Sequence, residues 1–555
     1  MIGIFYSLSA RSKCLITTLN PYHIMNTKTI NGVNYYMPSY NDEVLQLIVQ
    51  AHQNNQKISV RGAAHSIPLV KTNEEYGKYL YIILAEMKEI LHFDKQKGVV
   101  KVQAGCHLGL DPNDPTGIST IENSLVYQID PFDVKNGKRI PHTNPGWALP
   151  DLGGISHQTI GGFIATGSSG GSVHSNFEDA IISVDIAHYD GSQAVVKTFN
   201  RSENEDDAFF GIAFANLGLM GIVVSVTFQC IPSYYIFGSE ITTTTEECSI
   251  DLFGSGVVTT STAPAKLSVE DFFKQKNLYS RFMWWPQKGI DKMTVWQATA
   301  TPVANTPDWQ NFKSKPYNDL PPFPFKGDYT PANMAVYYIY TLLDDWPVWL
   351  EKLFGVGPRT RKDIEAFAER IAPNILKFIL KVFEPINQPQ TFQDIWWNGL
   401  PMDNEASDTW FPVWFTELWI SIDQTEAVMK DLNVFFESPK NAGNFSTEIY
   451  AAGSNLFWMS PAYKMDVIRI DIYWFGNDED GTPEEYYIPF WNELEKYNFR
   501  PHWAKFLPAP DSNQGVAYLS KQYPKWQQWR DLRVKMDPNN IFLTEYWDKK
   551  LNITG

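Results

Sequence analysis

The stretch LPDLGGISHQTIGGFIATGSSGGS, residues 149–172, holds seven glycines between positions 153 and 171. Glycine fills no space in a core and weakens regular elements, so this density does not serve core packing. Its backbone N–H groups stay unshielded, and they can approach a large polar ligand closely. We therefore expect this stretch to form a ligand-binding loop that decides the fold around it.

A second loop of small residues lies upstream, in VRGAAHS at residues 60–66. It follows the apolar segment KISV, which is typical of a strand, and it places His65 beside whatever the loop binds. Successive backbone donors in such a turn can form a concave site for phosphate. The two loops together predict one phosphate-bearing ligand.

Three phosphate-binding arrangements fit glycine-rich loops to different degrees. A Walker loop needs Gly-Lys-Ser or Gly-Lys-Thr, and TGSSGGS has no lysine. A Rossmann dinucleotide fold needs GxGxxG between a strand and a helix with an acidic residue about 20 positions on, and residues 167–171 lack that spacing. The remaining arrangement uses the separated loops 61–66 and 161–171 to clamp one pyrophosphate.

Composition limits the class of partner. The 46 basic and 62 acidic residues give a formal charge of -16, which argues against nucleic acid or an anionic membrane surface and favours a small molecule. A chain of 555 residues is long enough for two domains or one domain with a large insertion. A soluble protein without an integral membrane segment is expected, because no run of about 18 apolar residues occurs. The N-terminus MIGIFYSLSARSK is a poor secretory signal, and localisation stays open.

The four cysteines, Cys14, Cys106, Cys230 and Cys248, form no CxxC pair. Neither a zinc site nor a disulfide framework is expected, and no metal site is predicted elsewhere.

Periodicity predicts an α/β arrangement in the first part of the chain. Residues 37–55 have helical spacing, whereas KISV, YLYIILAEM, GVVKVQAG and the two arms around Asp190-Gly191 are typical of strands, the last pair as a hairpin. Aromatic residues become frequent from about residue 235 to 505. We expect a first domain over residues 30–235 that carries the two ligand-binding loops, a substrate-binding (cap) domain over 236–505, and a C-terminal return to the first domain over 506–555.

Four blocks carry a family resemblance: VRGAAHS, then LPDLGGISHQTIGGFIATGSSGGS, FEDAIISVDI and NLGLMGIVVSVTF, in this order within residues 36–230. They resemble the FAD domain of the vanillyl-alcohol oxidase flavoprotein family, also described as PCMH-type FAD-binding. The resemblance implies an α+β fold, with a two-subdomain FAD-binding domain and an α+β substrate domain built on an antiparallel sheet. It is closest to the type II cholesterol oxidases, whose FAD is covalent, through WWPQKGIDKMTVW, NFRPHWAKF and IFLTEYWDKKL as well.

The resemblance also assigns cofactor contacts. FAD is expected to bind Arg61, Gly62, Ala63, Ala64, His65, Ser66, Gly161, Gly162, Thr166, Gly167, Ser168, Gly171 and Ile222. A covalent link through His65 is implied, and a neutral imidazole has the nucleophilicity that such a bond to the flavin methyl requires.

Two motifs supply candidate catalytic residues. The first is FRPHWAKF, with His502 and Lys505; HWAK resembles the segment by which sugar-alcohol and aldonolactone oxidases of the family place a lysine at the flavin. The second is FSTEIYAAG, where Glu448 and Tyr450 share one face of a strand. Relatives often have glutamate-x-arginine here, so Tyr450 leaves the arginine's charge to Lys505, Arg469 or His502.

The segment DVIRIDIYWF places Arg469, Asp471 and Tyr473 on one face as well. Arg281 falls near the position of a gating glutamate of cholesterol oxidases, and with Trp285 it is a candidate substrate contact. In the expected reaction a hydride leaves a carbinol carbon for flavin N5, His502 or Glu448 accepts the hydroxyl proton, and Lys505 supports the reduced flavin's negative charge.

The substrate has more than one interpretation. Trp284, Trp285, Trp296, Trp396, Trp397, Trp410 and Trp414 offer flat apolar walls, which favours a hydrophobic or sterol-like alcohol, with dioxygen or another acceptor reoxidising the flavin. HWAK and Tyr450 favour the alternative, a sugar, sugar-alcohol or aldonolactone oxidase or dehydrogenase. A flavin- or carbohydrate-binding protein without turnover is the hypothesis of another class. Oxidase versus dehydrogenase and the oligomeric state stay open.

Overall fold

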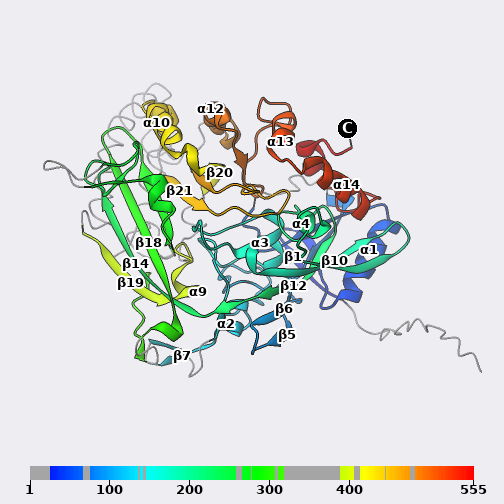
Figure 1. Ribbon diagram of the computed structural model, residues 1–555. Coiled ribbons are helices and arrows are strands. Elements are labelled where there is room, and N and C mark those ends of the chain that lie inside the picture. The colour runs from blue at the N-terminus through cyan, green and yellow to red at the C-terminus, as the bar shows by residue number, and fades with distance from the viewer. Residues whose placement is uncertain are drawn as a thin grey trace, which may run out of the picture.

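The computed structural model describes residues 25–66, 76–135, 138–141, 146–257, 265–276, 278–306, 311–317, 388–404, 413–443, 446–475 and 482–554. Trp410 and the N-terminal segment considered as a signal lie outside these residues. Three main sheets organise the described chain, with an eight-stranded sheet on one side and two N-terminal sheets on the other (Figure 1).

The first sheet has the order β1-β2-β4-β3, with β1 at Asn26–Ile30, β2 at Val33–Met37, β3 at Lys57–Arg61 and β4 at Tyr79–Ile83. Strands β2 and β3 both run parallel to β4. Helix α1, Asn41–Gln53, buries Val44, Leu47, Ile48 and Ala51, which have the i, i+3, i+4, i+7 spacing of one helical face. The predicted helix and the KISV strand are confirmed.

The second sheet is antiparallel and has the order β11-β10-β12-β6-β5. Its strands are β5 at Ile90–Asp94, β6 at Val99–Gln103, β10 at Ile181–Tyr189, β11 at Ala194–Asn200 and β12 at Ile222–Gln229. The predicted hairpin is confirmed, because β10 pairs with β11 and the turn is closed by the Asp190 N–H, which donates to the carbonyl of Gln193 over 3.0 Å.

The third sheet has eight strands, all paired antiparallel, in the order β19-β14-β18-β17-β21-β22-β20-β23. The strands are β14 at Tyr234–Thr243, β17 at Leu278–Trp285, β18 at Lys292–Pro302, β19 at Gln390–Ile395, β20 at Val413–Ser421, β21 at Thr447–Ala452, β22 at Val467–Phe475 and β23 at Arg500–Pro501. The helices around this sheet are α5 at Val269–Phe273, α9 at Trp396–Gly399, α10 at Thr425–Phe435, α11 at Pro439–Ala442 and α12 at Pro483–Leu494.

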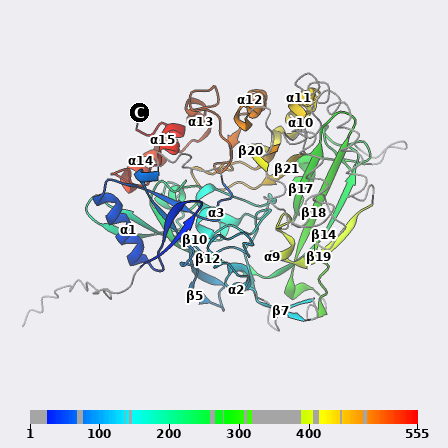
Figure 2. The same cartoon turned by 180° about the vertical axis from the view of Figure 1, so that it is seen from behind.

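The C-terminal helices return to the first sheet. They are α13 at Val516–Gln522, α14 at Trp526–Met536 and α15 at Glu545–Leu551, and from behind they lie above α1 (Figure 2). The N–H of Ile58 in β3 donates to the carbonyl of Ile541 over 2.7 Å, and the Glu545 N–H donates to the hydroxyl of Tyr79 in β4 over 3.0 Å. The end of the chain therefore stabilises the sheet that carries the loop of His65.

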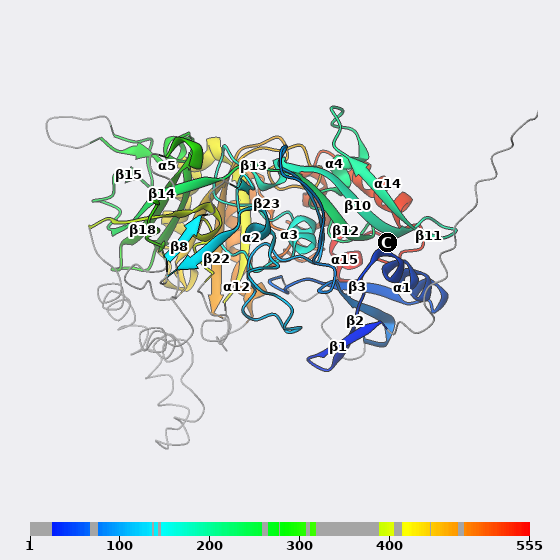
Figure 3. The same cartoon turned by 90° about the horizontal axis from the view of Figure 1, so that it is seen from below.

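Smaller elements connect the sheets. They are α2 at Leu125–Ile129, α3 at Ile160–Thr166, α4 at Ala208–Ile212, and the two-stranded pairs β7–β8 (Phe132–Lys135, Lys138–Pro141), β9–β13 (Trp147–Ala148, Ile231–Pro232) and β15–β16 (Ile250–Asp251, Leu267–Ser268). Seen from below, α1 and the first sheet lie at the opposite end of the molecule from β14 and β18 (Figure 3). The expected α+β class with an antiparallel second part is confirmed. Among the described residues, no helix is both long enough and apolar enough to cross a bilayer.

Candidate active site

The loop after β3 packs directly against the glycine-rich stretch 149–172. A Cβ atom at Gly62 would lie 2.6 Å from the Oγ1 of Thr159, so only glycine fits there without displacing its neighbour. Ala64 has a φ of +63°, a backbone conformation that is uncommon for a residue with a side chain. The structure thus brings together the two loops that the sequence predicts, with Gly62, Ala63, Ala64, His65 and Ser66 between β3 and the second loop.

The second loop is built around α3. Thr159 caps this helix by accepting a hydrogen bond from the Gly162 N–H over 3.2 Å, and Gly167 ends it with a φ of +71°. The Thr166 hydroxyl donates to the carbonyl of Gly162 over 3.0 Å and lies 3.0 Å from the hydroxyl oxygen of Ser168. These contacts fix the loop before it turns toward the eight-stranded sheet.

Three further predicted cofactor contacts lie at the edges of this loop. Gly161 packs on Ala104, and a Cβ atom at Gly171 would lie 2.9 Å from the carbonyl oxygen of Ser280 in β17. Ile222 is buried at the start of β12. Gly171 therefore permits the close approach of the loop to the eight-stranded sheet.

The loop residues fit a cofactor with a diphosphate group. The Nε of Arg61 is buried and has no hydrogen-bond partner among the described residues. An orphaned cationic donor costs free energy unless a ligand accepts from it, and an anionic phosphate oxygen is a suitable acceptor. Arg61 and the unshielded N–H group of Gly62 would hold such a group.

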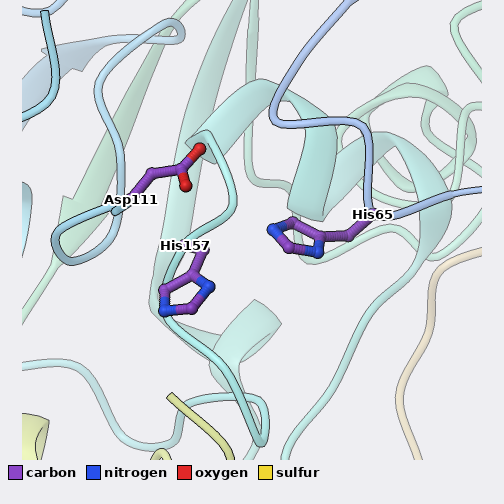
Figure 4. A group of neighbouring side chains, drawn as sticks. All are labelled: His65, Asp111 and His157. Atoms are coloured by element: carbon purple, nitrogen blue, oxygen red, sulfur yellow. The ribbon is translucent and has the colours of Figure 1, made fainter. Parts of the chain in front are cut away.

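His65 belongs to a small cluster that sequence reasoning missed. His65, Asp111 and His157 each place one ligand atom within 4.8 Å of the others, and the two imidazole ring centres are 5.6 Å apart (Figure 4). Two imidazoles and a carboxylate can bind a divalent cation, or they can pass a proton between them. The three residues come from separate loops, so no spacing in the sequence signals the cluster.

His65 is uncharged at neutral pH. Burial, followed by the positive charges of Lys505 and His107, lowers the pKa of His65 to about 4. The influence of Lys505 places the HWAK segment near this loop. A neutral imidazole keeps the lone pair that nucleophilic attack on a cofactor requires.

The candidate catalytic residues share one face of the eight-stranded sheet. Glu448 pairs with Asp471, and Tyr450 pairs with Arg469, across strands β21 and β22. Directly paired residues in an antiparallel sheet point to the same side. Glu417 on β20 pairs with Asp471 and extends the row.

Glu448 is buried and accepts three hydrogen bonds from side chains. Its Oε1 accepts from the Nη1 of Arg281 over 3.0 Å, and its Oε2 accepts from the hydroxyls of Tyr450 and Tyr473. Burial raises the pKa of Glu448, although the charge of Arg281 opposes the shift. Arg281, which the sequence suggested as a substrate contact, therefore forms an ion pair with Glu448.

Arg281 also links the sheet to the loop after α9. Its Nη1 donates to both carboxylate oxygens of Asp403 over 2.7 Å. The Asp403 N–H donates to the carbonyl of Gly154, and Asn404 accepts from the Ser156 N–H over 2.8 Å. Asp403 was missed in the sequence because nothing near it marks a functional motif.

Arg469 joins the same sheet face to the second glycine loop. Its Nε donates to Glu417 over 2.7 Å, while its Nη1 donates to the carbonyls of Ser169 and Gly170 over 3.3 Å and 2.5 Å. Although burial raises the pKa of Glu417, the charge of Arg469 brings it below the usual value. Glu417 was missed, and its only signal was a lone charge within the aromatic segment 410–422.

His502 and Lys505 follow β23 beside this face. The His502 N–H donates to the carbonyl of Glu417 over 2.9 Å, and the His502 Nδ1 accepts from the Ala504 N–H over 3.1 Å. Burial lowers the pKa of His502 to about 4, against the charge of Glu417. The Lys505 ammonium lies 3.5 Å from the ring centre of Phe415.

The tryptophans of the described chain mostly fill the core. Trp285 is 1% exposed at the end of β17, and Trp284 packs on Phe436 on the other face of the sheet. Trp396 donates from Nε1 to Asp130 over 2.9 Å, whereas Trp414 is 39% exposed. The expected apolar walls are therefore largely packing residues.

Comparison with known sequences identifies two segments. Residues 34–110 match the family described as FAD binding domain, and residues 363–550 match the family described as D-arabinono-1,4-lactone oxidase. L-gulonolactone oxidase of Scyliorhinus torazame is 23% identical over 521 residues, covering 93% of this chain and 94% of the relative. L-gulonolactone oxidase of Mus musculus is 22% identical over 520 residues, with the same coverage.

Comparison with solved structures addresses the fold. Cholesterol oxidase from Brevibacterium sterolicum superimposes with a TM-score of 0.62 at 17% identity, covering 94% of both chains. A BBE-like protein of Physcomitrella patens superimposes with a TM-score of 0.54 at 14% identity, covering 94% of this chain and 92% of its own. Both likenesses therefore extend over nearly the whole chain.

Proposed function

Because the chain is an FAD-dependent oxidoreductase of the vanillyl-alcohol oxidase flavoprotein family, we propose that it oxidises a CH–OH group of a sugar lactone or a related polyol. Dioxygen is the proposed acceptor, and hydrogen peroxide the second product. The match with this chain covers 94% of the length of two L-gulonolactone oxidases, which supports this class of substrate. The sterol-like alcohol that the tryptophans favoured is less well supported.

One observation carries the proposal. The sheet face that meets the second glycine loop bears five polar side chains beside the apolar Phe415 and Trp419: Arg281, Glu448, Tyr450, Arg469 and Tyr473. A sterol would cover this polar face with apolar surface, which is costly because the polar groups would lose water without gaining hydrogen bonds. A polyhydroxylated ring offers a donor or acceptor to each.

The proposed proton acceptor is Glu448 rather than His502. The Nδ1 of His502 accepts a hydrogen bond from the Ala504 N–H, so its ring proton lies on Nε2, which then donates instead of accepting. The Oε1 of Glu448 accepts from Arg281 alone among the described residues and has a second lone pair. A carboxylate whose pKa burial has raised is a suitable base near neutral pH.

The bound flavin supplies the hydride acceptor. Lys505 and Arg469 are then proposed to stabilise the negative charge that the cofactor gains, because both lie at the junction of the sheet face and the cofactor loops.

A covalent bond between His65 and FAD is part of the proposal. His157 and Asp111 lie where they can take the proton that His65 loses when this bond forms. Acid precipitation of the purified protein is the test: a yellow pellet that becomes colourless in His65→Ala supports the bond. His92→Ala, a change at an exposed histidine of β5, is the control and should keep the yellow pellet.

The experiment for the activity is anaerobic reduction of the flavin, followed at its visible absorption band. We expect L-gulono-1,4-lactone or D-arabinono-1,4-lactone to reduce the flavin faster than cholesterol, with peroxide released on admitting air. Reduction by cholesterol alone would overturn the polar substrate class. No reduction by any alcohol would support a flavin-binding protein without turnover.

A further inference from the structure

Three carboxyl groups stand in one row on the catalytic face of the eight-stranded sheet. Glu448 of β21, Asp471 of β22 and Glu417 of β20 are direct Cα partners across adjacent strands. Their exposed fractions are 4%, 3% and 2%. Side chains paired in this way have Cβ atoms about 4.5–5.5 Å apart, and like charges there repel.

Among the described residues, the outer two carboxyl groups each form an ion pair with an arginine, and the middle one forms no ion pair. Arg281 donates to Glu448 over 3.0 Å, and Arg469 donates to Glu417 over 2.7 Å. The Oδ1 of Asp471 is buried without a hydrogen-bond partner among the described residues. A buried carboxyl group between two carboxylates keeps its proton, because a third negative charge has no compensation there.

The other groups around Asp471 do not change this conclusion. Burial, followed by Glu417 and Glu448, raises the pKa of Asp471 well above its usual value, while Arg469 and Lys505 oppose the shift. The phenols of Tyr450, Tyr473 and Tyr487 also interact with Asp471, and they are neutral at physiological pH because burial raises the pKa of each.

The location of Asp471 indicates a ligand rather than a structural role. It shares its face with Arg469, whose Nη1 reaches the carbonyls of Ser169 and Gly170 in the second glycine loop. The side chain is therefore directed to the same region as the predicted cofactor. Buried polar atoms in folded proteins nearly always have partners, so an unpartnered one in such a place is explained by a ligand.

We propose that Asp471 is a substrate-binding residue whose carboxylic acid group donates a hydrogen bond to an oxygen of an uncharged polyhydroxylated substrate. The inference rests on the proposed function and narrows it. A neutral lactone places an oxygen beside this donor, whereas the open-chain sugar acid formed by its hydrolysis would bring a carboxylate against the row. The site is therefore selective for the lactone over the sugar acid.

Kinetics of the holoenzyme with two substitutions tests the contact. In steady-state oxidation of D-arabinono-1,4-lactone and L-gulono-1,4-lactone under air, Asp471→Leu should raise KM about tenfold or more, with kcat changed much less. Asp471→Asn keeps a donor of the same size and should change KM less. Asp531→Asn, at an exposed position of α14, is the control.

The pH profile separates binding from packing. In the wild-type enzyme, kcat/KM should fall as pH rises through the pKa of Asp471, since the donor becomes a third negative charge. Asp471→Asn should lack this alkaline decline. A profile that is unchanged in Asp471→Asn, or a wild-type KM in Asp471→Leu, would overturn the inference.

Thermal unfolding tests the buried proton without any substrate. The folded protein holds the proton above about pH 4, where the unfolded chain releases it, so folded-state stability falls as pH rises toward the folded pKa. Asp471→Asn should reduce this slope and unfold at an equal or higher temperature at pH 8. If the stability of both proteins depends on pH with the same slope, the inference is overturned. This holds whether or not a lactone reduces the wild-type flavin. A failure of the lactones to reduce the flavin, taken alone, counts only against the proposed function.

Discussion

The cofactor loops carry few charged side chains, whereas the sheet face opposite them carries many. In loops 61–66 and 161–171 the fit depends on glycine, as at Gly62 and Gly171, where a Cβ atom would lie 2.6 Å and 2.9 Å from its nearest neighbour. On the sheet the fit depends on which side chains the strand register brings together, as for Glu448 and Asp471.

This difference assigns distinct tasks to the two regions. Backbone N–H groups can recognise the diphosphate of FAD, so small residues suffice in the loops. Substrate recognition needs side chains of particular length and charge. Changes in the sheet should therefore alter rate and specificity, and changes in the loops should alter cofactor content.

The largest effect is expected at Glu448. Glu448→Gln keeps the hydrogen-bonding shape but cannot accept a proton, so flavin reduction should slow by about 10²–10⁴-fold with the FAD content unchanged. In the wild type the rate should fall as pH drops through the pKa of Glu448, which burial raises, and the variant should lack this limb. Stopped-flow absorption from pH 5 to 9 measures both.

The exposed Glu437 provides the control, and Glu437→Gln should behave as the wild type. If the flavin of the Glu448→Gln variant is reduced at a rate within threefold of the wild-type rate, another residue must be the base.

The cofactor half of the site was more predictable from the sequence than the substrate half. Loop 61–66 and the stretch 149–172 are short, contiguous and rich in glycine, so their composition alone indicates close approach to a ligand. The alternation in residues 445–453 also predicted that Glu448 and Tyr450 share a face. These signals are local in the chain.

The missed residues depend on contacts between distant segments. Asp403 accepts a hydrogen bond from Arg281, which lies 122 residues away in the sequence. In the same way His157 contacts His65 from a different loop. Glu417 faces Asp471 only because β20 pairs with β22, a register that no local pattern encodes. The prediction that the tryptophans line the substrate site failed for a related reason. An aromatic side chain is suited to core packing and to ligand contact alike, so the sequence does not distinguish the two.

The next largest effect is expected on stability, at Arg281. Arg281→Gln leaves Glu448 and Asp403 without their shared cation, and breaking a buried ion pair from one side costs about 3–5 kcal/mol. Urea unfolding of the holoenzyme at pH 7 measures the change. Lys464→Gln removes an exposed ion pair with Glu205 and should cost below about 1 kcal/mol. Equal costs in the two variants would show that Arg281 is not the cation on which this face depends.

A smaller effect is expected in the first loop, at Gly62. Gly62→Ala inserts a methyl group against Thr159, and overpacking of this kind costs about 1–3 kcal/mol. The FAD content per protein after gel filtration should fall. Gly77→Ala is the matched control, since a Cβ atom there has no neighbour within 4 Å. Full cofactor content in Gly62→Ala would mean that the loops need not touch to bind FAD.

The smallest effect is expected at Tyr450. Tyr450→Phe removes one of the hydroxyls that donate to Glu448, and a single hydrogen bond of about 0.5–1.5 kcal/mol corresponds to a roughly two- to tenfold loss in kcat/KM. Tyr450→Arg should lose more. Arg469 already lies 4.8 Å from the ring centre of Tyr450, and the pairing of Phe282 with Ile449 puts Arg281 on its other side. A third guanidinium would face two others, so a gain of activity in Tyr450→Arg would contradict this account of why tyrosine fits between them.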